Sequence, residues 1–433
     1  MAHQGGDIRR PGMFSAIIPV MFHATKIRLY PNAAQQDLIA RQLGCVRFVW
    51  NKALDVKKVA WTERRESLSI HTLITMLPVW KARDTPWLKE ADSQALQMTL
   101  RHLDRAYTNF FAHRARFPKF KKKHAPRQSY AYPQRVKVEG NKVFLPKVGW
   151  VKAVVHREIT GAIKTVTVSR SATGKYYAAV LTEDGKTRPE PVRPVTRVTG
   201  IDLGLNDAVI ASSGAKTPNP RFLRRSLKNL RRKPQSLSRK IEAAKTRCAA
   251  AGRPVADLRD YFGSHIAKDR RQVARAHERV RCAREDWQHK VSRQLADENQ
   301  AVCAETLNVK GMMKNRRLAR AISDVGWSGL VTKLEAKLKA RGGYLIRVDR
   351  FFPSNKTCSH CGAKNAALTL KDRTWTCAAC GTTHDRDVNA AINIRHQGIL
   401  QLKAAGLSVS IVGRMAYAHG GGVNPSPIGM VAA

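Results

Sequence analysis

Four cysteines near the carboxyl end of the chain have the spacing of a metal site. They form two C-x-x-C pairs, 15 residues apart and each followed by glycine: Cys358, Cys361, Cys377 and Cys380. Thiolates spaced in this way are typical of tetrahedral Zn²⁺, with each pair on a tight turn. Because sulfur would fill all four positions, we expect one structural zinc ion and no open catalytic position. His360 and His384 lie nearby, but neither is expected to be a ligand.

Three acidic residues in separate segments form a second candidate site. Asp202 lies within the apolar strand 198–203, Glu305 ends the apolar run AVCAE, and Asp387 opens DVNAAINI, which has a helical pattern. Any one of them alone would be read as a capping or turn residue. Together, on two strands and a helix of one α/β unit, they match the carboxylates that two-metal phosphodiester cleavage requires. Hard Mg²⁺ ions, or Mn²⁺, prefer such oxygen ligands.

The neighbouring acids Asp385 and Asp387 are expected to have different roles. On a helix running through 388–394, Asp387 shares a face with Ala391 and Ile394, which are suited to pack on a sheet. Asp385 would point away from that face, so we expect it to cap the helix or to pair with a basic group.

The charge of the chain predicts a polyanionic partner. Its 78 Lys and Arg against 32 Asp and Glu give a formal net charge of +46, and nucleic acid is the usual partner of such a protein. One basic run surrounds Phe117 and Phe120, an arrangement suited to phosphate contact and base stacking: Arg114, Arg116, Lys119, Lys121, Lys122 and Lys123. A second lies in 221–240: Arg224, Arg225, Arg231 and Arg232. The alternative for the first run is a solvated charged linker.

Other partner classes are disfavoured by the sequence. No stretch approaches the ~20 apolar residues of a membrane span, and the apolar run 14–22 lacks a signal-peptide cleavage pattern. We therefore expect no membrane partner and no small-molecule substrate. The other four cysteines are scattered singly, which indicates a reducing compartment rather than a disulfide framework.

The elements that must position these residues follow from periodicity. A strand at 27–30 precedes a helical region in which Asn32 and Gln35 form a capping box, and 96–110 carries one apolar stripe. Between 130 and 182 the period becomes two, with hairpin turns at 140–141 and 173–174, which favours a small β-barrel. After a Pro-rich linker near 189–194 come a strand-turn-strand over 198–211, a long helix over 273–295, and strands at 301–307 and 344–348.

Several of these segments resemble the TnpB family, the OrfB proteins of insertion sequences. The segments GIDLGLND, AETLNVKGM, CSHCG, CAAC and DRDVNAAINI occur in that family's order, FPKFKKK is also similar, and the likeness covers about residues 21–400. The resemblance implies a multidomain α+β protein. Its RuvC-like nuclease domain would have the RNase H fold and an inserted zinc ribbon, and a wedge β-barrel would carry a helical recognition insertion. The family's catalytic acids fall on Asp202, Glu305 and Asp387, and its zinc ligands on the four cysteines. Thr306 departs from the family, which more often has an acid there.

The implied domain boundaries can be placed along the chain. The wedge β-barrel would comprise 21–31 and 126–190, the helical recognition domain 32–125, the RuvC-like domain 195–356 and 385–405, and the zinc-binding domain 357–384. Residues 1–20 are expected to be an N-terminal extension, and 406–433 a disordered tail.

The resemblance implies an RNA-guided DNA endonuclease. A guide RNA from the transposon end (the ωRNA) would pair with double-stranded target DNA next to a transposon-adjacent motif. The protein would work in the cytoplasm of a prokaryote, associated with the nucleoid. Alternatives are a compact type V CRISPR effector, a nuclease-dead RNA-guided repressor or transposition accessory, and a transposase of its own element. The repressor would be expected to lack one of the three acids, and all three are present.

Overall fold

A computed structural model describes residues 20–410 apart from 188, 264 and 370. The chain divides into two compact units at the predicted Pro-rich linker, unit 1 ending at Arg188 and unit 2 starting at Pro189. Of the helices in the described ranges, none is long and apolar enough to cross a bilayer. Of the predicted extension 1–20, residues 1–19 lie outside the described residues, and Val20 begins the first strand.

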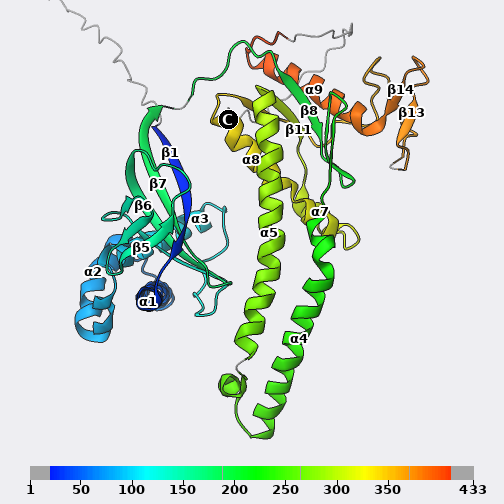
Figure 1. The fold of residues 1–433 in the computed structure, drawn as a ribbon. Coiled ribbons are helices and arrows are strands. Elements are labelled where there is room, and N and C mark those ends of the chain that lie inside the picture. The colour runs from blue at the N-terminus through cyan, green and yellow to red at the C-terminus, as the bar shows by residue number, and fades with distance from the viewer. Residues whose placement is uncertain (1–19, 188, 264, 370, 411–433) are drawn as a thin grey trace, which may run out of the picture. The chain divides into compact units, whose positions relative to one another are not determined.

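Unit 1 is a seven-stranded antiparallel sheet with a helical insertion. Its strands are β1 (Val20–Tyr30), β2 (Arg127–Tyr132), β3 (Lys137–Glu139), β4 (Lys142–Leu145), β5 (Gly149–Val154), β6 (Ala162–Ser171) and β7 (Tyr176–Thr187). The sheet order is β2-β6-β7-β1-β5-β4-β3, and Figure 1 shows β1 among strands from a much later part of the chain. As predicted, the first strand joins the later hairpins and the helices are inserted after it. The edge strands β2 and β3 are not paired with each other in this order, so closure into a barrel stays a prediction.

The inserted helices are α1 (Ala33–Arg64), α2 (Ile70–Val79) and α3 (Ser93–Phe111), with short turns at Trp80–Asp84 and Pro86–Glu90. The capping box of Asn32 and Gln35 is confirmed at the start of α1. The predicted apolar stripe is buried at Leu96, Leu100 and Leu103. Helices and sheet share one hydrophobic core, which includes Leu29, Leu100 and Tyr132. The helical region is therefore packed on the sheet rather than forming a core of its own.

Unit 2 is built on a five-stranded mixed sheet in the order β10-β9-β8-β11-β12. The strands are β8 (Val198–Asp202), β9 (Asp207–Ala211), β10 (Lys216–Pro218), β11 (Ala301–Glu305) and β12 (Tyr344–Val348). Strands β8, β11 and β12 are parallel to one another, and β9 and β10 join the sheet as antiparallel strands. Burial of β8 and β11 on both faces explains their continuous apolar sequences.

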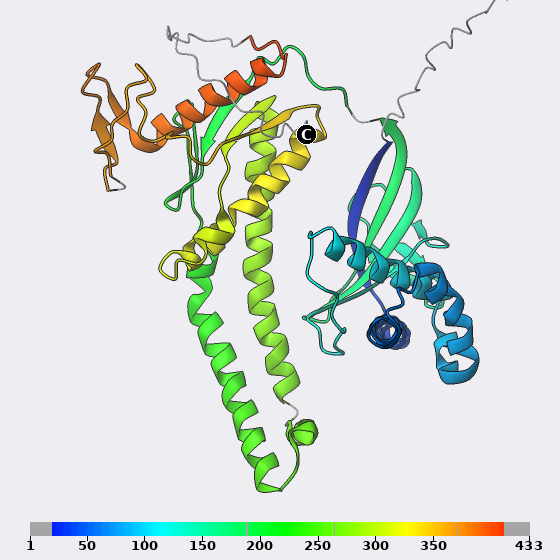
Figure 2. The ribbon, with the colours of Figure 1, turned by 180° about the vertical axis from the view of Figure 1, so that it is seen from behind.

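Helices cover both faces of this sheet. One face packs on α5 (His265–Glu298) and α8 (Trp327–Lys339), and the other on α9 (Arg386–Ala404). Short helices α6 (Val309–Met312) and α7 (Ala319–Val325) follow β11. Figures 1 and 2 show α4 (Phe222–Ala250) and α5 as a long hairpin that extends beyond the sheet. The basic segment 221–240, which the sequence left without an assigned element, forms most of α4.

Two further segments complete unit 2. The predicted zinc-binding domain has a two-stranded ribbon, β13 (Thr374–Thr376) and β14 (Thr383–Asp385), and a small core around Trp375. The prediction that a disordered tail begins at residue 406 is wrong for 407–410. Leu407 is buried there, and Val195 exchanges backbone hydrogen bonds with Ser408 and Ser410. Residues 411–433 of that tail lie outside the described residues.

Candidate active site and zinc centre

Strand periodicity directs Asp202 and Glu305 toward the same face of the sheet. On β8, Ile201 belongs to the core beneath α5 and α8, whereas Val198 faces α9. Gly200 also faces α9, because an added Cβ there would lie 2.1 Å from the Ala391 carbonyl oxygen. Successive side chains alternate across a sheet, so Asp202 follows Gly200 onto the α9 face.

Glu305 reaches the same face by the same alternation. Cys303 packs in the core under α9, and Glu305 is two residues further along β11. The parallel register pairs Ala304 with Ile201, which places Glu305 beside Asp202 at the carboxyl edge of adjacent strands. Since such strands lie about 4.8 Å apart, both carboxyl groups meet at one edge of the sheet.

Asp387 comes to this edge from the first turn of α9. Ala391 and Ile394, which share its helix face, are fully buried, as the sequence predicted. Asp385 is the N-cap: its carboxylate accepts from the Asp387 and Val388 amides, both at 3.0 Å, and pairs with Lys216 at 2.6 Å. The two acids therefore have separate roles, with the predicted capping role of Asp385 confirmed.

The three acids line one pocket of about 350 Å³, together with the loop 350–356. Burial, and then the charges of Asp387 and Glu305, raise the pKa of Asp202 to about 7. Burial also raises the pKa of Glu305, although the Ser354 hydroxyl donates to its carboxylate at 3.2 Å. Burial disfavours the charged forms of Asp202 and Glu305, and a bound cation would favour them. The donor set therefore fits hard divalent ions.

Two arginines form hydrogen-bonded ion pairs with the Asp387 carboxylate. Arg386 donates to Oδ1 from Nη2 at 2.8 Å and from Nε at 3.0 Å, and Arg373 Nη1 donates to Oδ2 at 3.0 Å. In the part of the chain that the structure describes, the three carboxylates do not form a close metal-binding group, whereas the four cysteines do. Both oxygens of the Asp387 carboxylate are thus paired with arginine in this structure.

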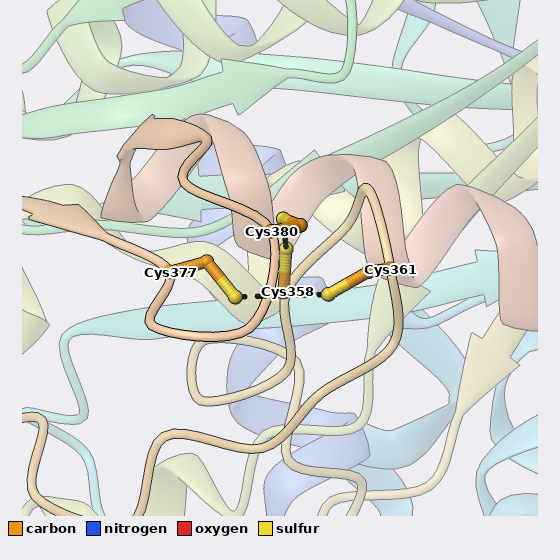
Figure 3. Close-up of side chains that lie close together, drawn as sticks. All are labelled: Cys358, Cys361, Cys377 and Cys380. Carbon is orange, nitrogen blue, oxygen red and sulfur yellow. Dashed lines mark hydrogen bonds between the residues drawn. The ribbon is translucent and has the colours of Figure 1, made fainter.

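The four cysteine sulfurs point toward one another (Figure 3) and lie within 4.8 Å of one another. Cys358 and Cys380 Sγ are 3.8 Å apart, and Cys361 and Cys377 Sγ are 3.6 Å apart. Tetrahedral Zn²⁺ with Zn–S bonds of about 2.3 Å requires a sulfur separation of about 3.8 Å. The cluster could therefore hold zinc with little rearrangement.

The surroundings of the cluster support this reading. The Gly362 and Gly381 amides close tight turns onto the Cys358 and Cys377 carbonyls, and both glycines have positive φ. His384 Nε2 lies 3.0 Å from Cys358 Sγ, and its ring lies against Trp375. His384 thus contacts one cysteine of the cluster, and its exclusion as a metal ligand stays a prediction.

The basic run 114–123 is fixed to α1 rather than extended as a linker. Trp50 Nε1 donates to the Lys119 carbonyl at 3.0 Å, and Asn51 exchanges hydrogen bonds with the Lys121 backbone at 2.7 and 3.0 Å. Lys121 Nζ lies 3.9 Å from the centre of the Trp50 ring, and burial lowers its pKa to about 8. All six basic residues of the run are exposed, Lys121 included: Arg114, Arg116, Lys119, Lys121, Lys122 and Lys123.

The second predicted basic set lies along α4, where its side chains are exposed: Arg224, Arg225, Arg231 and Arg232. Only Arg224 of this set lines a larger pocket of about 600 Å³, whose other arginines the sequence reasoning missed: Arg221, Arg316, Arg317 and Arg320. Buried Asp324 accepts from the Leu223 and Arg224 amides and so fixes the start of α4 beside this pocket. The run NRRLAR was visible in the sequence, but nothing local indicated that it meets α4.

Three segments of the chain match models of known protein families. Residues 179–316 match a family model described as "Probable transposase", of the insertion-sequence OrfB type, and residues 327–394 match one described as "Cas12f1-like, TNB domain". Residues 21–66 match an OrfB model described as "Helix-turn-helix domain". The structure has strand β1 followed by the single helix α1 in that segment.

A solved structure shares the fold. The Cas12f1 chain of the "Cas12f1-sgRNA-target DNA complex" aligns over 87% of this chain and 99% of its own, with a TM-score of 0.51 and 13% identity. The fold class is thus that of the Cas12-like proteins.

Sequence relatives define the family more narrowly. A Streptomyces pristinaespiralis protein named "Putative RNA-guided DNA endonuclease" is 37% identical over 90% of each chain. The Escherichia coli K12 protein "Putative RNA-guided DNA endonuclease InsQ" is 31% identical over 87% of this chain and 92% of its own. The chain belongs to the TnpB family, the OrfB proteins of insertion sequences.

Proposed function

We propose that this protein is an RNA-guided DNA endonuclease of the TnpB type. The observation that carries the proposal is the meeting of Asp202, Glu305 and Asp387 at one pocket, from three segments far apart in the sequence. The names of the two full-length relatives support the same activity. Helices on both faces of a mixed sheet, with the acids at its carboxyl edge, support a RuvC-like nuclease domain of the RNase H fold.

In this proposal Asp202, Glu305 and Asp387 hold two Mg²⁺ ions, with Mn²⁺ as a substitute. When bound, the ions would activate water and stabilise the leaving oxygen of the scissile phosphodiester. The chain's own contribution is to bring the carboxylates together on rigid elements. The close approach of Ala391 to Gly200 fixes α9 on β8, Asp385 caps the first turn of α9, and Ser354 donates to Glu305.

The four cysteines would hold one structural Zn²⁺. The module has only a two-stranded ribbon and a small core, too little to fold by burial alone. Zinc binding would therefore contribute most of its folding free energy. Since Arg373 next to β13 contacts Asp387, an ordered module would also place that arginine at the acidic pocket.

Exposed basic groups would bind the guide RNA and the double-stranded target DNA. In unit 1 these are the side chains of the run 114–123, with the partly exposed rings of Phe117 and Phe120 available for stacking. In unit 2 they are the arginines of α4 and of the 600 Å³ pocket. Such contacts position a nucleic acid without reading its sequence, so target choice would come from base pairing with the guide. Bacterial relatives agree with action in the cytoplasm at the nucleoid.

The experiment is to express the chain with its flanking DNA, purify it and sequence the bound RNA. We expect one RNA species that ends in the sequence beyond the transposon. The loaded protein should cut a plasmid that carries this sequence only when Mg²⁺ is present, and Asp202→Ala should bind the same plasmid without cutting it. Binding without cutting by the wild-type protein would favour the repressor alternative, and cutting that ignores the guide would refute the proposal.

A further inference from the structure

Two asparagines of α9 are buried without a role in the proposed metal site. Asn389 and Asn393 are one helical turn apart, so they lie on one face, and they are only 1% and 5% exposed. Burial of a carboxamide is unfavourable unless its polar atoms are paired. Both side chains bond the segment that leads into the predicted zinc module, Asn389 through both of its polar atoms and Asn393 through Nδ2.

Asn389 forms hydrogen bonds with the backbone on both sides of Cys358. Its Nδ2 donates to the Thr357 carbonyl at 2.7 Å, and its Oδ1 accepts from the Ser359 amide at 2.7 Å. Because a carbonyl can only accept and an amide N–H can only donate, the orientation of this carboxamide is fixed. Asn389, two residues after Asp387, thereby holds the turn at Cys358 on α9.

Asn393 binds the same segment at Ser354, four residues before Cys358, and at Thr357. Its Nδ2 donates to the Ser354 carbonyl at 2.7 Å and to the Thr357 carbonyl at 2.6 Å. The segment is itself a tight turn, because the Thr357 amide and hydroxyl both donate to the Pro353 carbonyl, at 3.1 and 2.9 Å. Ser354 is thus fixed between α9 and β11.

Ser354 connects this segment to Glu305 through a hydrogen bond. Only 6% of Ser354 is exposed, and its hydroxyl donates to Glu305 Oε1 at 3.2 Å. We propose that Asn389, Asn393 and Ser354 form a positioning link. It joins the zinc turn at Cys358 to the carboxylate of Glu305 and sets where Glu305 stands relative to Asp387. The inference rests on the proposed function and adds residues that act through Glu305.

The test compares Ser354→Ala with Ser354→Thr, which keeps the hydroxyl. Loss of a partner that orients a metal ligand typically costs 10- to 100-fold in metal affinity or activity. We expect Ser354→Ala to raise the half-saturating Mg²⁺ concentration for cleavage about 10-fold and Ser354→Thr to stay near wild type. Zinc content and guide-directed DNA binding should be unchanged in both. An unchanged Mg²⁺ dependence of Ser354→Ala, or an equal defect in Ser354→Thr, would overturn the link to Glu305.

Asn389→Ala tests the other end of the link. It leaves the Ser359 amide and the Thr357 carbonyl without this partner, so we expect faster zinc loss to a chelator together with a higher Mg²⁺ requirement. Gln397→Ala, which removes a carboxamide from the next turn of α9, is the control and should change neither. Zinc loss at the wild-type rate in Asn389→Ala would overturn the link to the zinc turn.

One further readout separates this inference from the proposed function. The rise in unfolding temperature on adding Mg²⁺ reports metal binding whether or not DNA is cut. If the wild-type chain does not cleave, the proposed function fails, and the link is still judged by whether Ser354→Ala needs about 10-fold more Mg²⁺ for the same temperature rise. Equal temperature rises in both proteins would overturn it.

Discussion

Replacing Asp202 with Asn should stabilise the magnesium-free protein while ending cleavage. The Asp202 carboxylate lies at the end of a buried strand, with Glu305 and Asp387 on the same pocket. Its pKa rises from an ordinary value of 3.8 to about 7. Ionisation in the folded state is therefore unfavourable, and Asn, which is neutral and similar in shape, removes that cost.

The magnitude follows from the two pKa values. A difference of about three, at about 1.4 kcal/mol for each tenfold change, makes the ionised form cost about 4 kcal/mol. The sign is that of an acid with a raised folded-state pKa. The cost is absent below pH 3.8, grows as the pH rises toward 7, and is constant above that. The gain in unfolding free energy for Asp202→Asn should be about 1.5 kcal/mol at pH 5 and about 4 kcal/mol at pH 8.

The assay is thermal unfolding in magnesium-free buffer without a chelator, which leaves zinc in place. For a domain of this size, the pH 8 gain corresponds to a rise of about 10 °C in the midpoint of unit 2. Added Mg²⁺ should raise the wild-type midpoint and leave that of the variant unchanged. Asp286→Asn, on the exposed surface of α5, is the matched control and should have little effect at either pH. The reasoning is refuted if Asp202→Asn lowers the midpoint at pH 8, or raises it equally at pH 5 and pH 8.

The other sites give predictions of their own. Cys377→Ser should release zinc, measured by metal analysis, and slow cleavage because Arg373 and the turn at Cys358 lose their support; full zinc content would show that the cluster is misassigned. Replacing the pocket arginines by Gln should lower the salt dependence of nucleic-acid binding by about one unit of slope per lost phosphate contact, and an unchanged slope would exclude them: Arg316, Arg317 and Arg320. Replacing three exposed lysines of the first basic run by Gln should likewise lower the salt dependence of RNA binding: Lys119, Lys122 and Lys123. Lys121→Gln, which loses the Trp50 ring, should instead lower the stability of unit 1 by about 1 kcal/mol, and a wild-type unfolding midpoint would contradict this.

Local features of the fold could be predicted because short-range physics determines them. The capping box at Asn32, the hairpin turn at Gly140 and the strands that carry Asp202 and Glu305 depend on neighbours within a few residues. Capping and period-two alternation are both visible in the sequence. The spacing of the cysteines carried similar information, because each pair occupies one turn.

Features that depend on long-range packing could not be predicted in this way. The sequence grouped the first strand with the later hairpins, but it did not give the place of β1 between β7 and β5, which joins residues more than 100 positions apart. The same holds for the arginine pocket and for the hydrogen bond from Ser354 to Glu305, where a common serine gains its role from position alone. The basic segment of α4 was missed as a helix because its buried residues, Ala244 and Cys248, lie beyond residue 240 and because Pro234 lies within it.

The pair Asp385 and Asp387 provides the most discriminating test of the active site, because the two acids differ by only two positions. The Asp385 carboxylate accepts hydrogen bonds from two backbone amides, which is the role of an N-cap, and it also pairs with Lys216. Losing an N-cap costs about 1 kcal/mol of stability. Asn at this position can still accept those hydrogen bonds, so Asp385→Asn should cut DNA at a reduced but measurable rate. Asp387 lines the acidic pocket with Asp202 and Glu305, and its carboxylate is held there by Arg373 and Arg386. Asp387→Asn loses a proposed metal ligand and should not cut at all, while keeping its fold and its guide-directed DNA binding. A plasmid-cleavage time course on both variants decides between them, and the reverse ranking would move the catalytic assignment two residues toward the zinc ribbon.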